Sequence, residues 1–210
     1  MGWWTDHAVP RIVDKALNTK EIPPLRDRTC RGLRGDVVEI GFGSGLNAPH
    51  YPPTVRSVSA VEPSDVAWRM ASARIEKTGP LVVRAGLDGA RLDLPDDSFD
   101  SALSTFTMCT IPDLDAALAE ILRVLRPGGV LHFVEHGRSP DPAVARWQDR
   151  LQPIQGRVAG GCHLNRAIAD HLSGSGLALE DLDTFYEGRP KFISYLYLGR
   201  ATKVSAAEPS

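Results

Sequence analysis

The sequence lacks a strong net charge, a long hydrophobic run and an even set of cysteines. The net charge is −2 and the pI is near 6.3, which argues against a nucleic-acid partner because such proteins usually carry a basic patch. No apolar run at the N-terminus reaches signal-peptide or membrane-spanning length, so we expect no integral membrane segment. The three cysteines, Cys30, Cys109 and Cys162, are odd in number and widely spaced, which indicates a reducing, cytoplasmic setting without a disulfide framework.

The amino-acid composition is typical of a soluble globular protein. Hydrophobic residues make up 42% and charged residues 24% of 210 positions, which is enough for one domain with a sizeable core. We expect an N-terminal helical cap at 1–34, a core at 35–201 and a polar tail at 202–210. Within the core, 137–170 is less regular and is predicted to be an insertion on the substrate side.

Short apolar runs and helical patterns alternate along the core, which favours an α/β fold. Strands are expected at 36–41, 57–62, 81–85, 99–105, 130–135, 177–183 and 191–201, and helices at 9–17, 25–32, 63–77, 113–125 and 165–173. The loop between the last two strands is too short for a parallel crossover, so the last strand must pair antiparallel. The sequence therefore predicts a Rossmann-like, doubly wound, seven-stranded sheet that is mostly parallel, with one antiparallel strand near the C-terminus.

A glycine loop follows the first predicted strand. Gly41, Gly43 and Gly45 alternate with other residues there, and glycines at a strand end let a ligand approach bare backbone. The second predicted strand ends at Glu62, about 20 residues on, where an acid is placed to accept both hydroxyls of a ribose. The combination indicates a cofactor that contains adenosine.

The spacing of the loop favours one such cofactor over another. Dinucleotide sites use Gly-x-Gly-x-x-Gly with a pyrophosphate on the following helix, whereas this loop is Gly-x-Gly-x-Gly and is preceded by Glu39. A carboxylate is a poor neighbour for a pyrophosphate and a good one for the ammonium or sulfonium of S-adenosylmethionine (SAM). The alternative is a generic Rossmann turn whose acid only caps a helix.

Over about residues 34–201 the chain resembles the class I SAM-dependent methyltransferases, and four motifs carry this resemblance. They are Val38-Glu39-Ile40-Gly41-x-Gly43-x-Gly45, Glu62, Leu94-Pro95-Asp96-Asp97-Ser98-Phe99-Asp100 and Glu120-x-x-Arg123-Val124-Leu125-Arg126-Pro127-Gly128-Gly129. Three further motifs are similar to the methyltransferase-like alkyl thiol methyltransferases and their bacterial relatives. These are Thr105-x-x-x-Cys109, Phe133-x-Glu135-His136 and Gly161-Cys162-x-Leu164-x-Arg166.

The resemblance implies a cofactor site on the sheet edge. Its members would be Glu39, Gly41, Gly43, Gly45, Glu62, Asp88, Gly89, Thr105 and Phe106. The first acid and the glycine loop would hold the amino-acid end of SAM, and the second acid would hold the ribose. The pair after the third strand would contact the adenine edge, and the pair after the fourth strand would line the methionine part.

Two histidines are candidates for the acceptor side of the reaction. His136 lies just past the fifth predicted strand, at the edge where ligands bind in open α/β sheets, and His163 lies in a Gly-Gly-Cys-His loop. Either would serve as a general base or orient the substrate, while the alternative for His136 is a hydrogen bond to loop backbone. Cys109 is expected to be a small wall residue. Cys162 and His163 have no third ligand nearby in sequence, so we assign no metal site.

We predict a SAM-dependent methyltransferase that acts on a small molecule. A thiol is the favoured acceptor because its pKa, near ~8.5, asks little of a base, whereas a phenol near ~10 asks more. The same-chemistry alternative is O- or C-methylation of a phenol or quinone. The alternatives from other classes are a non-catalytic SAM-binding protein and a hydride-transferring dehydrogenase.

Overall fold

A single mixed sheet organises the molecule, as a computed structural model shows for residues 7–158 and 160–204. The strand order is β3-β2-β1-β4-β5-β7-β6. The strands are β1 (Gly35–Ile40), β2 (Val55–Val61), β3 (Leu81–Gly86), β4 (Phe99–Thr105), β5 (Leu125–His136), β6 (Leu177–Tyr186) and β7 (Tyr195–Lys203). The pairs among β1 to β5 are parallel. β7 runs antiparallel to both of its neighbours, which confirms the predicted sheet.

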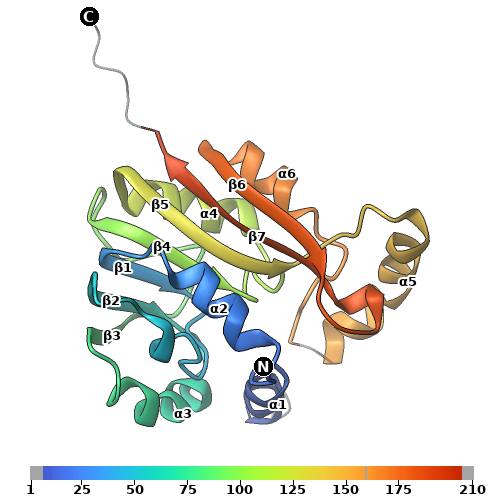
Figure 1. Cartoon of the computed structure of the whole chain (residues 1–210), viewed down its shortest axis with the longest axis horizontal. Coiled ribbons are helices and arrows are strands. Elements are labelled where there is room, and N and C mark those ends of the chain that lie inside the picture. The colour runs from blue at the N-terminus through green and yellow to red at the C-terminus, as the bar shows by residue number, and fades with distance from the viewer. Residues whose placement is uncertain (1–6, 159, 205–210) are drawn as a thin grey trace, which may run out of the picture.

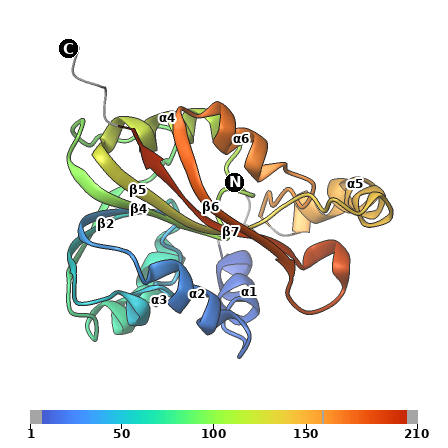
Figure 2. The same cartoon turned by 45° about the horizontal axis from the view of Figure 1, so that its top comes forward.

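Helices cover both faces of this sheet (Figures 1 and 2). One face carries α1 (Val9–Ala16), α2 (Ile22–Cys30) and α3 (Asp65–Ile75), and the other carries α4 (Leu114–Val124) and α6 (Ile168–Gly174). α5 (Pro142–Val158) stands beyond the end of the sheet beside the loop that joins β6 and β7. No helix in the described part of the chain is both long and apolar enough to span a bilayer.

Each face of the sheet has its own apolar core because successive side chains of a buried strand point to opposite sides. Val38 packs with the residues of α4 and α6, including Leu118 and Leu172. Its neighbour Val37 packs with Cys30 of α2 and Ala71 of α3. Burial on both faces fixes the sheet as the rigid platform that carries the loops at its carboxyl edge.

Two helices begin at residues other than those predicted, and prolines explain both cases. α2 begins at Ile22, so Pro23 and Pro24 lie in its first turn rather than in a break before it; the first turn needs no proline N–H. α3 begins at Asp65, and Pro63 precedes it. The hydroxyl of Ser64 accepts a hydrogen bond from the Ala67 amide and caps this helix.

Four other boundaries also differ. The predicted helix-starting loop at 43–50 is a turn with one short 3-10 segment, η2 (Ala48–His50). β5 begins at Leu125, five residues early, because Leu125 already pairs with Phe99 of β4. β7 continues to Lys203, which pairs with Leu177, so the tail does not begin at 202. A second 3-10 segment, η3 (Lys191–Ile193), occupies the predicted start of the last strand.

Candidate functional site

The glycine loop after β1 has the backbone conformation that its sequence predicts. Gly41, Gly43 and Gly45 have φ angles of 74°, 58° and 75°, a region that side chains disfavour. A Cβ on Gly41 would lie 2.1 Å from the hydroxyl of Thr107, whereas a Cβ on Gly43 would meet nothing closer than 3.9 Å. Gly41 is therefore needed for packing, and Gly43 leaves one face of the loop open to a ligand.

Glu62 connects the end of β2 to this loop. Its Oε2 accepts a hydrogen bond from the Gly43 amide at 2.7 Å, and its Oε1 accepts one from the Ser64 amide at 2.6 Å. The side chain is 6% exposed, and burial raises the pKa of Glu62 above its ordinary value. The structure therefore brings together the loop and the acid that the sequence assigned to one cofactor.

Glu39 lies in β1, just before the glycine loop, and is completely buried. Its carboxylate accepts hydrogen bonds from Asn47 Nδ2 at 2.8 Å and from the hydroxyl of Tyr51. Burial raises the pKa of Glu39 to about 7, against 4.5 in the open chain. A buried carboxylate with so high a pKa is stabilised in its charged form by a nearby cation, so its environment suits the positive end of SAM.

Arg26 belongs to the same polar network, although no sequence pattern predicted this position for it. The side chain comes from α2 and donates to Asn47 Oδ1 at 2.6 Å and to Thr105 Oγ1 at 2.9 Å. It is 3% exposed, and burial lowers its pKa. The predicted N-terminal cap thus places a cation inside the site. No local pattern could have found it, because Asn47 and Thr105 lie 21 and 79 residues away along the chain.

A second part of the cap reaches the outer side of the loop. Asp14 of α1 accepts a hydrogen bond from the Ser44 hydroxyl and forms an ion pair with Arg74 of α3, with 3.0 Å between its Oδ1 and the guanidinium nitrogen. Arg74 also donates to the Ser44 carbonyl at 2.8 Å. α1 is therefore fastened to the glycine loop as well as to the helix behind it. Trp3 and Trp4 lie outside the described residues.

The remaining predicted cofactor residues lie at the ends of β3 and β4. Thr105 turns its hydroxyl into the network of Arg26 and Asn47. Phe106 adopts a left-handed conformation with φ of 54°. Asp88 is exposed and caps the amide of Ala90 at 2.9 Å, while a Cβ on its neighbour Gly89 would lie 2.8 Å from Ile40. Their contacts with SAM remain predictions.

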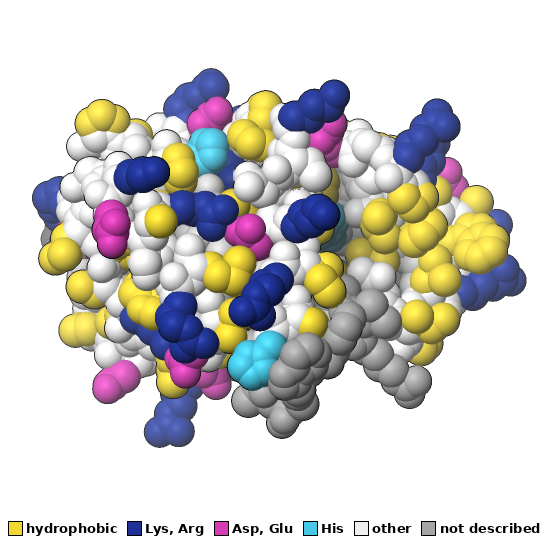
Figure 3. Space-filling view, turned by 90° about the horizontal axis from the view of Figure 1, so that it is seen from below, with side chains coloured by type: hydrophobic (Ala, Val, Ile, Leu, Met, Phe, Trp, Pro, Cys, Tyr) yellow, Lys and Arg dark blue, Asp and Glu magenta, His cyan; other side chains and the backbone are white. Residues whose placement is uncertain are grey.

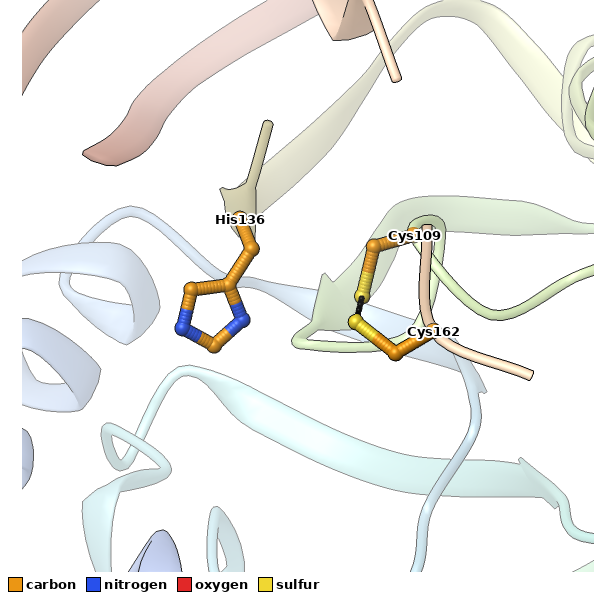
Figure 4. Close-up of side chains that lie close together, drawn as sticks. All are labelled: Cys109, His136 and Cys162. Atoms are coloured by element: carbon orange, nitrogen blue, oxygen red, sulfur yellow. Dashed lines mark hydrogen bonds between the residues drawn. The ribbon is translucent and has the colours of Figure 1, made fainter. Parts of the chain in front are cut away.

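His136 ends β5 and lies beside two cysteines from other parts of the chain (Figure 4). Its ring packs on Phe106 with 5.0 Å between centroids. The sulfur atoms of Cys109 and Cys162 are 3.4 Å apart, and one ring nitrogen of His136 lies within 4.8 Å of both. The hydrogen bond to Cys162 and burial raise the pKa of the Cys109 thiol well above its ordinary value.

Neighbouring residues fix the segments that carry this cluster. Glu135 is fully buried and accepts hydrogen bonds from Ser104 Oγ at 2.8 Å and the Thr107 amide at 2.9 Å. The His163 amide donates to the Cys109 carbonyl at 2.7 Å, and its Nδ1 is buried without a partner among the described residues. Arg166 pairs with neither Glu135 nor any other carboxylate described, and instead donates to the carbonyls of Met108 and Ile111.

Exposed apolar side chains and a hollow mark the surface near α5. Figure 3 shows apolar side chains gathered at its right-hand end, over α5, and a hollow between them and the rest of the molecule. Two of the exposed apolar residues there are Trp147 and Ile154, at 55% and 64% exposure. Both side chains are therefore more than half exposed on the surface of α5.

A seven-stranded sheet of this order, with a glycine loop and two acids at its carboxyl edge, is the architecture of the class I SAM-dependent methyltransferases. The solved structure of a SAM-dependent methyltransferase from Mesorhizobium loti superposes with a TM-score of 0.64 at 19% identity, over 88% of this chain and 98% of that one. Residues 38–133 match the family model of the methyltransferase domain. This match and the structural neighbours that are SAM-dependent methyltransferases imply SAM as the cofactor.

Two curated relatives show the range of acceptors among similar proteins. Thiol S-methyltransferase TMT1B of Rattus norvegicus is 33% identical over 147 residues, which is 66% of this chain and 59% of the relative. Phosphatidylethanolamine N-methyltransferase of Cereibacter sphaeroides is 31% identical over 126 residues, which is 56% of this chain and 62% of the relative. The chain spans less than two thirds of the length of these relatives.

Proposed function

We propose that the protein transfers the methyl group of SAM to the sulfur of a small thiol. The observation that carries this proposal is the position of His136. Its ring packs on Phe106, the residue that follows β4, and so it stands at the same sheet edge as the glycine loop. The similarity to thiol S-methyltransferases supports sulfur as the acceptor atom. We also propose that the acceptor is a small molecule and that the protein is cytoplasmic. The three cysteines, which are free thiols, support the cytoplasmic setting.

The residues present fit SAM. The open face of Gly43 leaves room for a ligand, Glu62 supplies a carboxylate beside it, and Glu39 favours a nearby cation. Buried Arg26 adds a positive charge suited to the ligand's carboxylate. When bound, SAM supplies a methyl group on a sulfonium, which is a good leaving group. The chain's own task is to hold the acceptor in line and to exclude water.

On the acceptor side, His136 is the group we assign to activating the thiol. A thiol with a pKa near ~8.5 loses its proton with modest help, so one imidazole beside the acceptor suffices. Phe106 fixes one face of the imidazole, and the two cysteines lie beside its edge. His163 belongs to the same loop as Cys162 and lies further from the acceptor in this proposal, where it supports that loop.

The test is methyl transfer from deuterium-labelled SAM to a panel of acceptors, read by mass spectrometry. The panel contains alkyl thiols, phenols, a quinone and a primary amine. We expect labelled thioether as the main product, and His136→Gln to lower kcat/KM by about 10²-fold or more while SAM affinity is kept. The matched control is His171→Gln, because His171 pairs with Asp115 on the opposite face of the sheet. Turnover of phenol, quinone or amine with no thioether formed would assign a different acceptor atom.

A further inference from the structure

Two thiols and one imidazole meet at the acceptor end of the site. They come from three separate segments, because Cys109 follows β4, His136 ends β5 and Cys162 lies between α5 and α6. Their ligand atoms all lie within 4.8 Å of one another. Among the described residues no other group of three or more His, Cys, Asp or Glu side chains meets that condition. Figure 4 shows the three side chains directed toward a common point.

We propose that Cys109, His136 and Cys162 bind one zinc ion and leave its fourth position for the acceptor sulfur. Two cysteines, one histidine and an open position form a known donor set for catalytic zinc. With Zn–S bonds of ~2.3 Å, two thiolates on tetrahedral zinc stand roughly 3.7 Å apart, close to the 3.4 Å between these sulfur atoms. The use of the fourth position rests on the proposed function, whereas binding of the ion does not.

The two cysteines are held in place by contacts that need no metal. The Cys109 amide donates to buried Glu135 at 3.4 Å, which fixes the turn after β4. Gln152 of α5 donates to the Cys162 carbonyl at 3.1 Å and accepts from the Leu164 amide at 3.0 Å. Supporting contacts of this kind orient metal ligands before the ion arrives. Glu135 also adds a negative charge next to the position of the cation.

The chemistry of such a site explains how a thiol becomes reactive here. A thiol that coordinates zinc loses its proton to solvent, and the resulting thiolate attacks the methyl carbon of SAM. One S–C bond forms at the acceptor, and the C–S bond of the sulfonium breaks with its electron pair left on the departing thioether. His136 then acts as a ligand of the ion, and the ion replaces a general base.

The direct test is metal binding by the full chain, prepared without an affinity tag and under reducing conditions. We expect one equivalent of zinc by elemental analysis after dialysis, and tight binding in competition with a chromophoric chelator. Cobalt in place of zinc should give a thiolate-to-metal absorption band in the near ultraviolet. An alkyl thiol added without SAM should change that spectrum, because the sulfur enters the open position.

Variants identify the ligands. Cys109→Ala, Cys162→Ala and His136→Ala are each expected to weaken zinc binding by at least about 100-fold. The matched control is Cys30→Ala, because Cys30 is equally buried but belongs to the apolar core under α2; it should bind zinc normally. Circular dichroism and SAM affinity check that each variant is folded.

The outcomes separate this inference from the proposed function. Thiol methylation without stoichiometric zinc would overturn the zinc site and leave the methyltransferase proposal standing. If the wild type binds zinc, the three variants do not, and the wild type methylates no thiol, the zinc site is upheld and a thiol as the acceptor is refuted. A protein that binds no zinc and carries a Cys109–Cys162 disulfide, detected as a mass two hydrogens lower, would also overturn the inference.

Discussion

We expect the charge state of Glu39 to make the affinity for the cofactor depend on pH. Its carboxyl is fully buried, and its pKa is raised to about 7 in the ligand-free protein. We propose that this carboxyl faces the ammonium of SAM or of S-adenosylhomocysteine, which then binds best when the carboxyl is charged. Arg26 and Tyr51 also face it, and Glu62 lies near enough to raise its pKa further.

The magnitude follows from the fraction of Glu39 that is charged. With a pKa of about 7, roughly a tenth of the carboxyls are ionised at pH 6 and roughly nine tenths at pH 8. We therefore expect S-adenosylhomocysteine to bind about tenfold more weakly at pH 6 than at pH 8, which is about 1 kcal/mol. Above pH 8 the affinity should level off.

Titration calorimetry at several pH values measures this slope directly. Glu39→Gln should remove the slope. Glu120→Gln should keep it, because Glu120 pairs with Arg123 on the other face of the sheet. Equal wild-type affinity at pH 6 and pH 8, or an unchanged slope in Glu39→Gln, would refute the assignment of a cation to this carboxylate.

The same shift has a consequence for stability without ligand. The folded pKa of Glu39 lies above the unfolded value of 4.5, so the stability that this group contributes is complete below pH 4.5. It is lost as the pH rises through about 7. The loss at higher pH is roughly 3 kcal/mol. Urea denaturation of the wild type and of Glu39→Gln over pH 5–8 should show the two stabilities diverge if this sign is right.

Two other sets of variants separate packing from binding. Gly43→Ala should strongly weaken the binding of S-adenosylhomocysteine and lower the free energy of unfolding by about 1 kcal/mol. Gly41→Ala, whose Cβ would strike Thr107, should lower the free energy of unfolding by about 1–3 kcal/mol. Calorimetry measures the binding and urea denaturation the stability, and equal losses of both in the two variants would contradict this difference. Arg26→Met should cost about 1–3 kcal/mol for each buried partner left unsatisfied, measured by urea denaturation, and an unchanged stability would remove Arg26 from the network of Asn47 and Thr105.

The sheet and the glycine loop could be predicted because their signals are local. Val37 and Val38 lie in an apolar run that forms a buried strand, and Gly41 to Gly45 follow it directly. The contact between Gly43 and Glu62 also follows, because adjacent parallel strands end at one edge. The boundary errors at Pro23 and Pro63 arose because a proline is compatible both with a break and with a first helical turn.

The rest of the site depends on contacts between distant segments, and a single sequence does not specify them. Arg26 enters the network of Glu39 only because α2 packs across β5 and the end of β4. Cys162 faces Cys109 only because the segment after α5 folds back over the turn after β4. The sequence places Cys162 next to His163, but in the fold Cys162 lies with Cys109 and His136 instead.

We propose above all that the acid-flanked glycine loop binds a positively charged sulfur nucleoside. Calorimetric titration of the full chain with SAM, and separately with NAD, tests it most directly. We expect one SAM molecule bound per chain and no heat of binding with NAD. Saturable binding of NAD without binding of SAM would contradict it.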